Sequence, residues 1–303
     1  MTLNELRYIV AVAEERNFRR AAERVFVSQP ALSLAVRKLE TELGVQIFER
    51  GPAEVALTPL GGQIVAQARR ALEECERIRA IAGGGADPLQ GPLKLGVIYS
   101  VAPYLLPDVI PALRKRAPAM PLEIEENLTA NLETMLENGV LDAVIVALPF
   151  GGPRIVTQPL YDEDFHAVVP LDHPWAKRRQ VKAEELAAQN VLLLSSGHCF
   201  SNQVVEACPE LARRGGRVLQ GNSLETVRNM VASGLGITVL PASANQDKYR
   251  NGLTRAIPFA RPVPARRVVL AWRSHAPREQ AMQVLAAAIR EAVAAGAAFR
   301  SSR

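Results

Sequence analysis

Apolar residues in the first 82 positions recur every three or four residues, which is the spacing of amphipathic helices. Ser28 suits the N-cap of a helix that Gly44 ends, and Thr58 suits the N-cap of the next one. We therefore predict helices over residues 3–15, 18–25, 29–43 and 59–82. On the third helix we expect these side chains to face inward: Ala31, Leu32, Ala35, Val36, Leu39 and Leu43.

The second and third predicted helices are joined by a tight turn at 27–30, the arrangement of a helix-turn-helix. Gln29, Ser33 and Arg37 share one exposed face of the third helix, where they could reach base edges and phosphates of DNA. A plain helical hairpin with a solvated face explains the same pattern. Two short apolar runs, 45–48 and 55–57, predict a β-hairpin, or wing, after the third helix.

The fourth predicted helix carries a stripe of apolar residues at alternating spacings of four and three. The stripe consists of Ile64, Ala68, Ala71, Cys75, Ile78 and Ala82. Such a heptad seam is typical of a coiled coil between two chains. Packing on the seam accounts for Cys75 without redox chemistry. The glycines at 83–85 end the helix, and 86–92 is expected to be a linker.

From residue 93 onward, short apolar runs alternate with helical patterns, which predicts an α/β fold with mainly parallel sheets. Strands are expected at 93–98, 122–125, 143–148, 191–194 and 237–240. Trp175 and Trp272 are expected in the core. Ligands of such folds bind at strand ends and helix N-termini.

A length of 303 residues suggests two or three domains. No apolar run reaches the roughly 20 residues of a membrane span, and the N-terminus lacks a secretory signal pattern. We therefore expect a cytoplasmic chain, in which a disulfide is transient. The net charge of +5 does not by itself indicate nucleic-acid binding, because basic and acidic residues balance within 1–62 and the surplus lies after residue 260.

Cys199 and Cys208 lie nine positions apart, and His198 precedes the first. A thiol beside a histidine, with a second thiol in reach, is the layout of a redox switch. An oxidant converts one thiolate into a sulfenic acid, and the other thiol captures it as a disulfide. Two buried cysteines acting as small apolar residues are the alternative. No metal site or other cofactor is expected, because no Cys-x-x-Cys spacing or fourth ligand accompanies these residues.

Residues 1–90 resemble the winged helix-turn-helix and linker helix of LysR-type transcriptional regulators. The resemblance rests on Ala21-Ala22, the run 27–33, Leu39-Glu40, Leu43-Gly44, Phe48-Glu49-Arg50, Leu57-Thr58 and Gly61. It implies a regulator rather than an enzyme, which dimerises through the linker helices. The double-stranded promoter DNA would be contacted by Ser28, Gln29, Pro30, Ser33, Arg37 and Arg50. The wing departs from the family, because Gly51-Pro52-Ala53-Glu54 replaces its usual basic residues.

Residues 92–303 resemble the two-lobed, periplasmic-binding-protein-like effector domain of the same regulators, and more narrowly the peroxide-sensing members. The matching segments are 103–107, 173–176, 197–199 with Cys208, 223–226, 228–231 and 236–238. The resemblance implies a DNA-binding domain at 1–58, a linker helix and hinge at 59–91, and an effector domain at 92–303. Its lobe I covers 92–161 with 268–303, and its lobe II covers 163–266.

The resemblance also implies the roles of individual residues. Cys199 would be the peroxidatic thiol and Cys208 the resolving one. The peroxide pocket would contain Ser100, Thr129, His198, Asn202 and Arg266. Ser100 stands where the family commonly has Thr, and Asn202 where it commonly has Asp. Capping remains the alternative role for Ser100 and Thr129, and Arg267 is the rival of Arg266.

The implied mechanism is a disulfide switch. Hydrogen peroxide oxidises Cys199, Cys208 condenses with it, and the local refolding re-spaces the DNA-binding dimers of a homotetramer that activates RNA polymerase at oxidative-stress genes. Two other functions stay open. One is a LysR-type regulator that binds a small metabolite between the lobes, whose response Cys199→Ser would leave intact. The other is a thiol peroxidase, against which the helix-turn-helix and the heptad seam argue.

Overall fold

The computed structural model describes all residues except 51–54, 83–86, 208–218, 250, 296–299 and 302–303. The described chain forms two compact units. The first consists of Met1–Asp87 with the short segment Glu137–Val140, and the second of Pro88–Leu136 and Leu141–Arg303. Among the described residues, no helix is long and apolar enough to cross a membrane.

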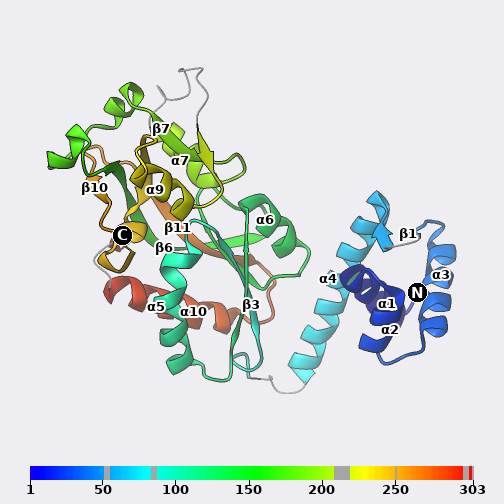
Figure 1. Cartoon of the computed structure of the whole chain (residues 1–303). Coiled ribbons are helices and arrows are strands. Elements are labelled where there is room, and N and C mark those ends of the chain that lie inside the picture. Colours follow the sequence, from blue (N-terminus) through cyan, green and yellow to red (C-terminus); the bar gives the residue numbers. More distant parts are fainter. Residues whose placement is uncertain (51–54, 83–86, 208–218, 250, 296–299, 302–303) are drawn as a thin grey trace. The chain divides into compact units, whose positions relative to one another are not determined.

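The first unit is a helical bundle with a small hairpin (Figure 1). Its elements are α1 (Leu3–Glu15), α2 (Phe18–Arg24), α3 (Gln29–Leu43), β1 (Phe48–Arg50), β2 (Val55–Leu57) and α4 (Pro59–Ala82). The predicted helices and the hairpin are therefore confirmed. One apolar cluster, built around Ile9, Leu32 and Val36, holds α1, α2 and α3 together and takes in the first turns of α4.

The ends of α3 and α4 are determined by local hydrogen bonds. Ser28 Oγ accepts from the Ala31 N–H at 3.4 Å, and Gly44 ends α3 with a φ of 68°. Thr58 Oγ1 accepts from the Gly61 N–H at 2.8 Å. The expectation that Ala31 and Leu43 face inward is wrong, since both are exposed. The buried residues of α3 are Leu32, Val36 and Leu39; Ala31 lies beside this stripe, and Leu43 lies in the last turn, beyond it.

The second unit is built on a ten-stranded mixed sheet in the order β4-β3-β5-β11-β6-β9-β7-β8, with β10 and β12 also paired to β6. Its strands are β3 (Leu93–Ile98), β4 (Leu122–Asn127), β5 (Ala143–Ala147), β6 (Ile155–Pro170), β7 (Val191–Leu194), β8 (Gln220–Gly221), β9 (Ile237–Pro241), β10 (Thr254–Pro258), β11 (Ala265–Arg273) and β12 (Arg300–Ser301). Its helices are α5 (Ala102–Arg116), α6 (Thr129–Glu137), α7 (Cys199–Ala207), α9 (Leu224–Ala232) and α10 (Glu279–Ala295). Single 3-10 turns are η1 (Pro174–Lys177), η2 (Ala183–Ala188), η3 (Ala242–Asn245) and η4 (Asp247–Tyr249).

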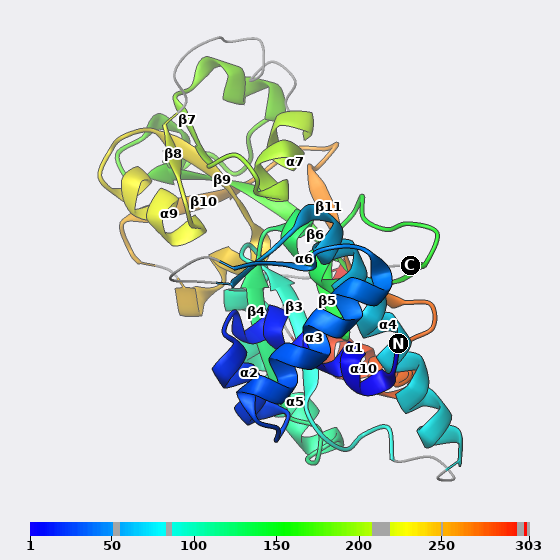
Figure 2. The same cartoon turned by 90° about the vertical axis from the view of Figure 1, so that its right-hand side faces the viewer.

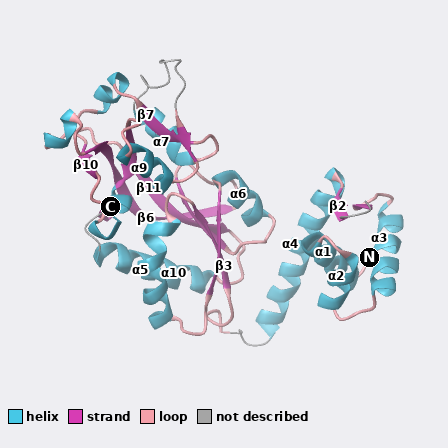
Figure 3. Ribbon diagram, in the orientation of Figure 1, coloured by secondary structure: helices cyan, strands magenta, loops and turns pink. Residues whose placement is uncertain are grey.

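The prediction of mainly parallel sheets is wrong. Among the strands that the structure describes in this unit, only β3 with β4 and β5, and β7 with β8 and β9, pair in parallel. The two long strands β6 and β11 form an antiparallel pair through the middle of the sheet (Figure 3). The apolar pattern of a buried strand is the same in either direction, so the sequence could not distinguish them.

Two separate apolar cores divide this unit into two lobes, which lie toward opposite ends of it (Figure 2). Lobe I packs α5, α6 and α10 around β3 and β5 and contains Trp272. Lobe II packs α7 and α9 around β7 and β9 and contains Trp175. Both tryptophans are therefore in the core, as predicted. Strand β6 contributes Leu160 to the first core and Phe165 to the second, so it connects the lobes.

Candidate functional sites

The carboxyl ends of β3 and β4 and the amino end of α7 enclose a small cavity, here called the thiol cavity. β3 and β4 are parallel neighbours with Ile98 opposite Asn127, so the loops that follow them meet. The cavity is lined by Ile98, Tyr99, Ser100, Asn127, Leu128, Thr129, His198 and Cys199. Its volume is about 10 Å³, which is about the room of one water-sized sphere. It therefore suits only a very small polar molecule.

Cys199 is the first residue of α7 and carries a free, half-buried thiol. Its side chain packs against the core of lobe I, whereas the next residue, Phe200, lies in the core of lobe II. His198 is half-buried beside it, with its ring 5.7 Å from that of Tyr99. Burial lowers the pKa of His198 below its usual value of 6.5. The imidazole at this site is therefore neutral at pH 7.

Behind the thiol cavity, Arg266 forms a buried polar cluster with Ser100 and Glu163. Its Nη1 donates to Ser100 Oγ at 2.7 Å, and its Nε donates to Glu163 Oε2 at 2.8 Å. The guanidinium also lies 5.1 Å from the ring of Phe200. Burial alone would lower the pKa of Arg266, but the Glu163 carboxylate to which it is hydrogen-bonded raises that pKa above its usual value. The cation is therefore held permanently next to the thiol cavity.

Four of the predicted pocket residues line the thiol cavity together: Ser100, Thr129, His198 and Cys199. Arg266 reaches the cavity through Ser100, whereas its rival Arg267 pairs with Asp162 on the surface. Helix or loop capping does not account for the hydroxyl of Ser100 or for that of Thr129. Ser100 Oγ accepts from Arg266, and Thr129 Oγ1 is buried without a hydrogen-bond partner among the described residues.

Asn202 is not part of this cavity, so its prediction as a pocket residue is corrected. It is exposed, because α7 turns Phe200, Ser201 and Val204 toward the protein and leaves the side of Asn202 in solvent. Cys208 lies outside the described residues.

The sequence reasoning missed Tyr99, Leu128 and Glu163. Tyr99 directly follows the predicted strand 93–98, so the rule that sites form at strand ends could have pointed to it. Glu163 had no such signal. It stands between Asp162 and Asp164, and only the fold determines which of the three acidic side chains is buried.

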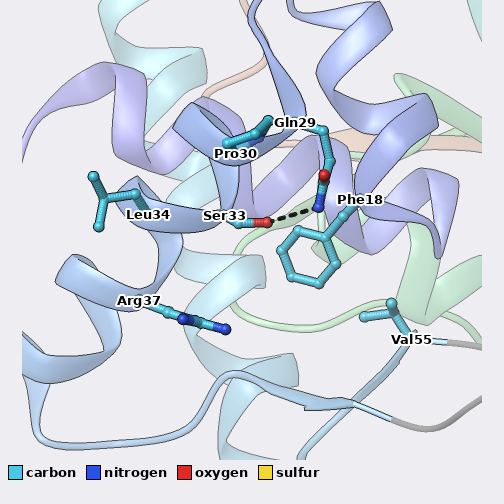
Figure 4. A pocket seen from close by; sticks show the side chains of 7 residues that line it. All are labelled: Phe18, Gln29, Pro30, Ser33, Leu34, Arg37 and Val55. Carbon is cyan, nitrogen blue, oxygen red and sulfur yellow. Dashed lines mark hydrogen bonds between the residues drawn. The ribbon is translucent and has the colours of Figure 1, made fainter.

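A second candidate site is the exposed face of α3 (Figure 4). Gln29, Pro30, Ser33, Leu34 and Arg37 line an open hollow of about 640 Å³ together with Phe18 and Val55. Gln29 Nε2 donates to Ser33 Oγ at 3.2 Å. The predicted common face of Gln29, Ser33 and Arg37 thus exists, and Ser28 caps the helix beneath it. The side chain of Arg50 and residues 51–54 of the wing lie outside the described part.

A polar recognition helix in a helix-turn-helix, a long helix after it and a two-lobed α/β unit with a thiol cavity define a DNA-binding regulator with an effector domain. Comparison with known families agrees. Residues 3–62 match the bacterial regulatory helix-turn-helix proteins of the lysR family, and residues 86–294 match the LysR substrate binding domain.

Relatives that match over nearly the whole chain indicate which group of this family the chain belongs to. The chain is 40% identical over 291 residues to the DNA-binding transcriptional dual regulator OxyR of Escherichia coli K12, which covers 96% of this chain and 95% of that protein. It is 39% identical to the hydrogen peroxide-inducible genes activator of Pectobacterium carotovorum, with 96% of each chain covered. A variant of full-length OxyR from Pseudomonas aeruginosa superposes with a TM-score of 0.87 at 51% identity, covering 96% of this chain and 98% of that one. The chain therefore belongs to the LysR family of transcription regulators, among the hydrogen peroxide-inducible activators called OxyR.

Proposed function

We propose that this protein senses hydrogen peroxide through Cys199 and controls oxidative-stress genes through a Cys199–Cys208 disulfide. The observation that carries the proposal is the thiol cavity, which combines a free thiol, two hydroxyls and a neutral imidazole in the space of one very small polar molecule. A hydrogen peroxide-bound OxyR variant from Corynebacterium glutamicum, 34% identical with a TM-score of 0.64, supports it. It covers 96% of this chain and 92% of that one.

The residues of the cavity suit attack on a peroxide. The Cys199 thiolate attacks one oxygen, so that an S–O bond forms, the O–O bond breaks and the other oxygen leaves as water after taking a proton. Thr129 Oγ1 has no other partner among the described residues, and Ser100 Oγ already accepts from Arg266, which leaves its own hydrogen free to donate. Both hydroxyls can therefore hold the peroxide oxygens. The Arg266 cation behind Ser100 attracts the thiolate and the leaving hydroxide.

Disulfide formation requires α7 to unwind. Cys199 and Ala207 are eight residues apart on this helix, and a rise of about 1.5 Å per residue separates their Cα atoms by about 12 Å. One further peptide spans about 3.8 Å. An intact α7 thus holds the Cα atoms of Cys199 and Cys208 at least about 8 Å apart, but a disulfide needs about 4.4–6.8 Å. The second oxidation step is therefore coupled to refolding of this segment.

Unwinding of α7 alters contacts between the lobes, which connects the chemistry to the whole effector unit. The Cys199 side chain leaves the core of lobe I, and Gln203 of α7 loses the bond that its Nε2 donates to Leu148 O at 3.2 Å. A shift between two packing arrangements of the effector domains would then re-space the DNA-binding units.

The remaining assignments follow from the family and are part of the proposal. Domains at 1–58, 59–91 and 92–303 would serve DNA binding, dimerisation and sensing. The far end of the α4 seam supports dimerisation, since Ile78 is 66% exposed in the single chain, whereas Ala68 is buried in the core of its own unit. We extend this to a homotetramer that binds promoter DNA and acts on RNA polymerase. Because bacterial promoters lie in the cytoplasm, that is its expected location.

Peptide mass spectrometry after brief exposure to stoichiometric hydrogen peroxide tests the proposal. We expect a Cys199–Cys208 disulfide in the wild type and in Cys75→Ser, the matched control. In Cys199→Ser no disulfide should form, and the change in DNA binding on oxidation should be lost. If Cys199→Ser kept a full peroxide response, the thiol would be incidental, and a metabolite between the lobes would become the better hypothesis.

A further inference from the structure

Tyr99 is the most exposed residue of the thiol cavity. It follows the last residue of β3 and lines the cavity with His198 and Cys199. The exposed fraction of Tyr99 is 40%, whereas that of its neighbours Ile98 and Ser100 is 3% each. The other residues of the lining are buried or half-buried. Tyr99 is therefore the most exposed member of the cavity wall.

Two close approaches shape the wall of the cavity. The ring of Tyr99 packs on that of His198, with the centroids 5.7 Å apart and the planes at 56°. On another side, the turn before α7 approaches Leu128 closely. A Cβ placed on Gly197, whose φ is 101°, would lie 3.1 Å from the Leu128 side chain. The Leu128 side of the wall is thus closely packed, whereas the Tyr99 ring is its exposed member.

We propose that Tyr99 sets the size limit of the hydroperoxide that reaches Cys199, so that hydrogen peroxide enters and bulky organic hydroperoxides are excluded. The inference rests on the proposed function of Cys199. A cavity of about 10 Å³ admits hydrogen peroxide after a small shift of the ring. An alkyl or aryl group needs the space that the ring itself occupies.

The chemical step is the same for every hydroperoxide. The thiolate attacks the terminal oxygen of ROOH, the S–O bond forms as the O–O bond breaks, and the alkoxide leaves and takes a proton to become ROH. The sulfur loses two electrons and the peroxide gains them. Because this step does not depend on the R group beyond its leaving ability, which a wall mutation does not alter, a change in selectivity between hydroperoxides reports access.

Rates of Cys199 oxidation should be measured by quench and mass spectrometry on the full chain, with hydrogen peroxide and cumene hydroperoxide as probes. Tyr99→Ala should raise the rate with cumene hydroperoxide relative to that with hydrogen peroxide by at least about tenfold, the discrimination that a tight pocket exerts on one methylene group. Tyr99→Leu should raise this ratio less, and Tyr99→Phe should leave it unchanged. Leu253→Ala, which truncates a side chain 59% exposed and outside the cavity, is the matched surface control.

The outcomes separate the two hypotheses. If the ratio of the two oxidation rates were unchanged in both Tyr99→Ala and Tyr99→Leu, the size limit at Tyr99 would be overturned but peroxide sensing would be left intact. If Tyr99→Ala does not fold, Tyr99→Leu alone decides. Absence of Cys199 oxidation by hydrogen peroxide in the wild type would instead overturn the proposed function, and with it the size limit at Tyr99.

Discussion

At the scale of single residues, neighbours in sequence can have opposite roles. Arg266 and Arg267 are adjacent on β11 and each pairs with a carboxylate, but their side chains point to opposite faces of the sheet. Arg266 and Glu163 are fully buried, with 2.7 Å between Nη2 and Oε2. The Arg267–Asp162 pair has a similar distance of 2.7 Å and lies in solvent. Burial, rather than pairing, therefore distinguishes the residue behind the thiol cavity.

This difference predicts the stability of two matched variants. Arg266→Met leaves Glu163 buried and uncompensated, and we expect the free energy of unfolding to fall by about 3–5 kcal/mol. Arg267→Met should change it little, because solvent screens that pair. Urea unfolding followed by tryptophan fluorescence measures this directly, since both tryptophans lie in the effector unit. Equal losses of unfolding free energy in the two variants would contradict the assignment of Arg266, rather than Arg267, as the buried partner of a carboxylate.

A second residue-scale prediction concerns pH. Burial lowers the pKa of His198 in the folded protein below its usual value of 6.5, so the unfolded chain binds a proton more readily as the pH falls. The contribution to stability is thus complete above about pH 6.5 and is lost as the pH falls through that value toward the folded-state pKa. Between pH 7 and 5.5, the urea midpoint of His198→Gln should fall less than that of the wild type. Parallel pH profiles would show that His198 does not contribute.

At the scale of elements, the start of α4 shows how tightly the wing and the linker helix are joined. A Cβ on Gly61 would lie 2.0 Å from the carbonyl oxygen of Ile47, whereas one on Gly62 would meet nothing within 4 Å. Thr58 joins the same two segments, because its Oγ1 donates to Gln46 O at 2.8 Å and accepts from the Gly61 N–H. The first turn of α4 is therefore held closely against the segment that leads into the hairpin.

Two adjacent glycines provide the test. Gly61→Ala should destabilise the DNA-binding unit by about 1–3 kcal/mol through overpacking, and Gly62→Ala should stabilise it by up to about 1 kcal/mol through helix propensity. Thermal unfolding by far-UV circular dichroism measures both. Tryptophan fluorescence should stay unchanged, because it reports the other unit. A stable Gly61→Ala variant would mean that the two segments can separate without cost.

At the scale of the whole effector unit, two kinds of contact between the lobes can be compared, besides the Arg266–Ser100 hydrogen bond. The first kind involves α5: Tyr104 Oη donates to Glu225 at 2.8 Å, and Lys248 pairs with Asp108 at 2.7 Å. Burial and the nearby Glu225 raise the pKa of Tyr104 well above its usual value, so this donor stays protonated. The second kind depends on α7, through Gln203 and Cys199. Under the proposed mechanism, oxidation of Cys199 would act on the second kind.

Hydrogen exchange followed by mass spectrometry can resolve this difference. On oxidation, the amides of 199–207 should exchange at least about tenfold faster, because unwinding removes their helical hydrogen bonds. The amides of α5 and α9 should change little. Cys199→Ser treated with peroxide is the control and should show no increase. Unchanged protection of α7 in the disulfide form would be incompatible with the coupling derived above.

Much of this protein was determined by the sequence on its own, namely whatever depends on residues close together along the chain. Helix limits follow from caps such as Ser28 and Thr58, and the common face of Gln29, Ser33 and Arg37 follows from the helical period. The family motifs are equally local. They predict the type of regulator and the reactive thiol at Cys199.

The tertiary structure decided what depends on distant segments meeting. The thiol cavity joins residues near positions 99, 128 and 198, and whether a polar side chain lies inside it depends on the side of the strand or helix that faces the core. That dependence buried Arg266 and Glu163, left Arg267 and Asn202 at the surface, and made Tyr99 the most exposed residue of the cavity wall. It also made the central strands antiparallel, because hydrogen bonding between strands leaves no trace in the apolar pattern of either strand.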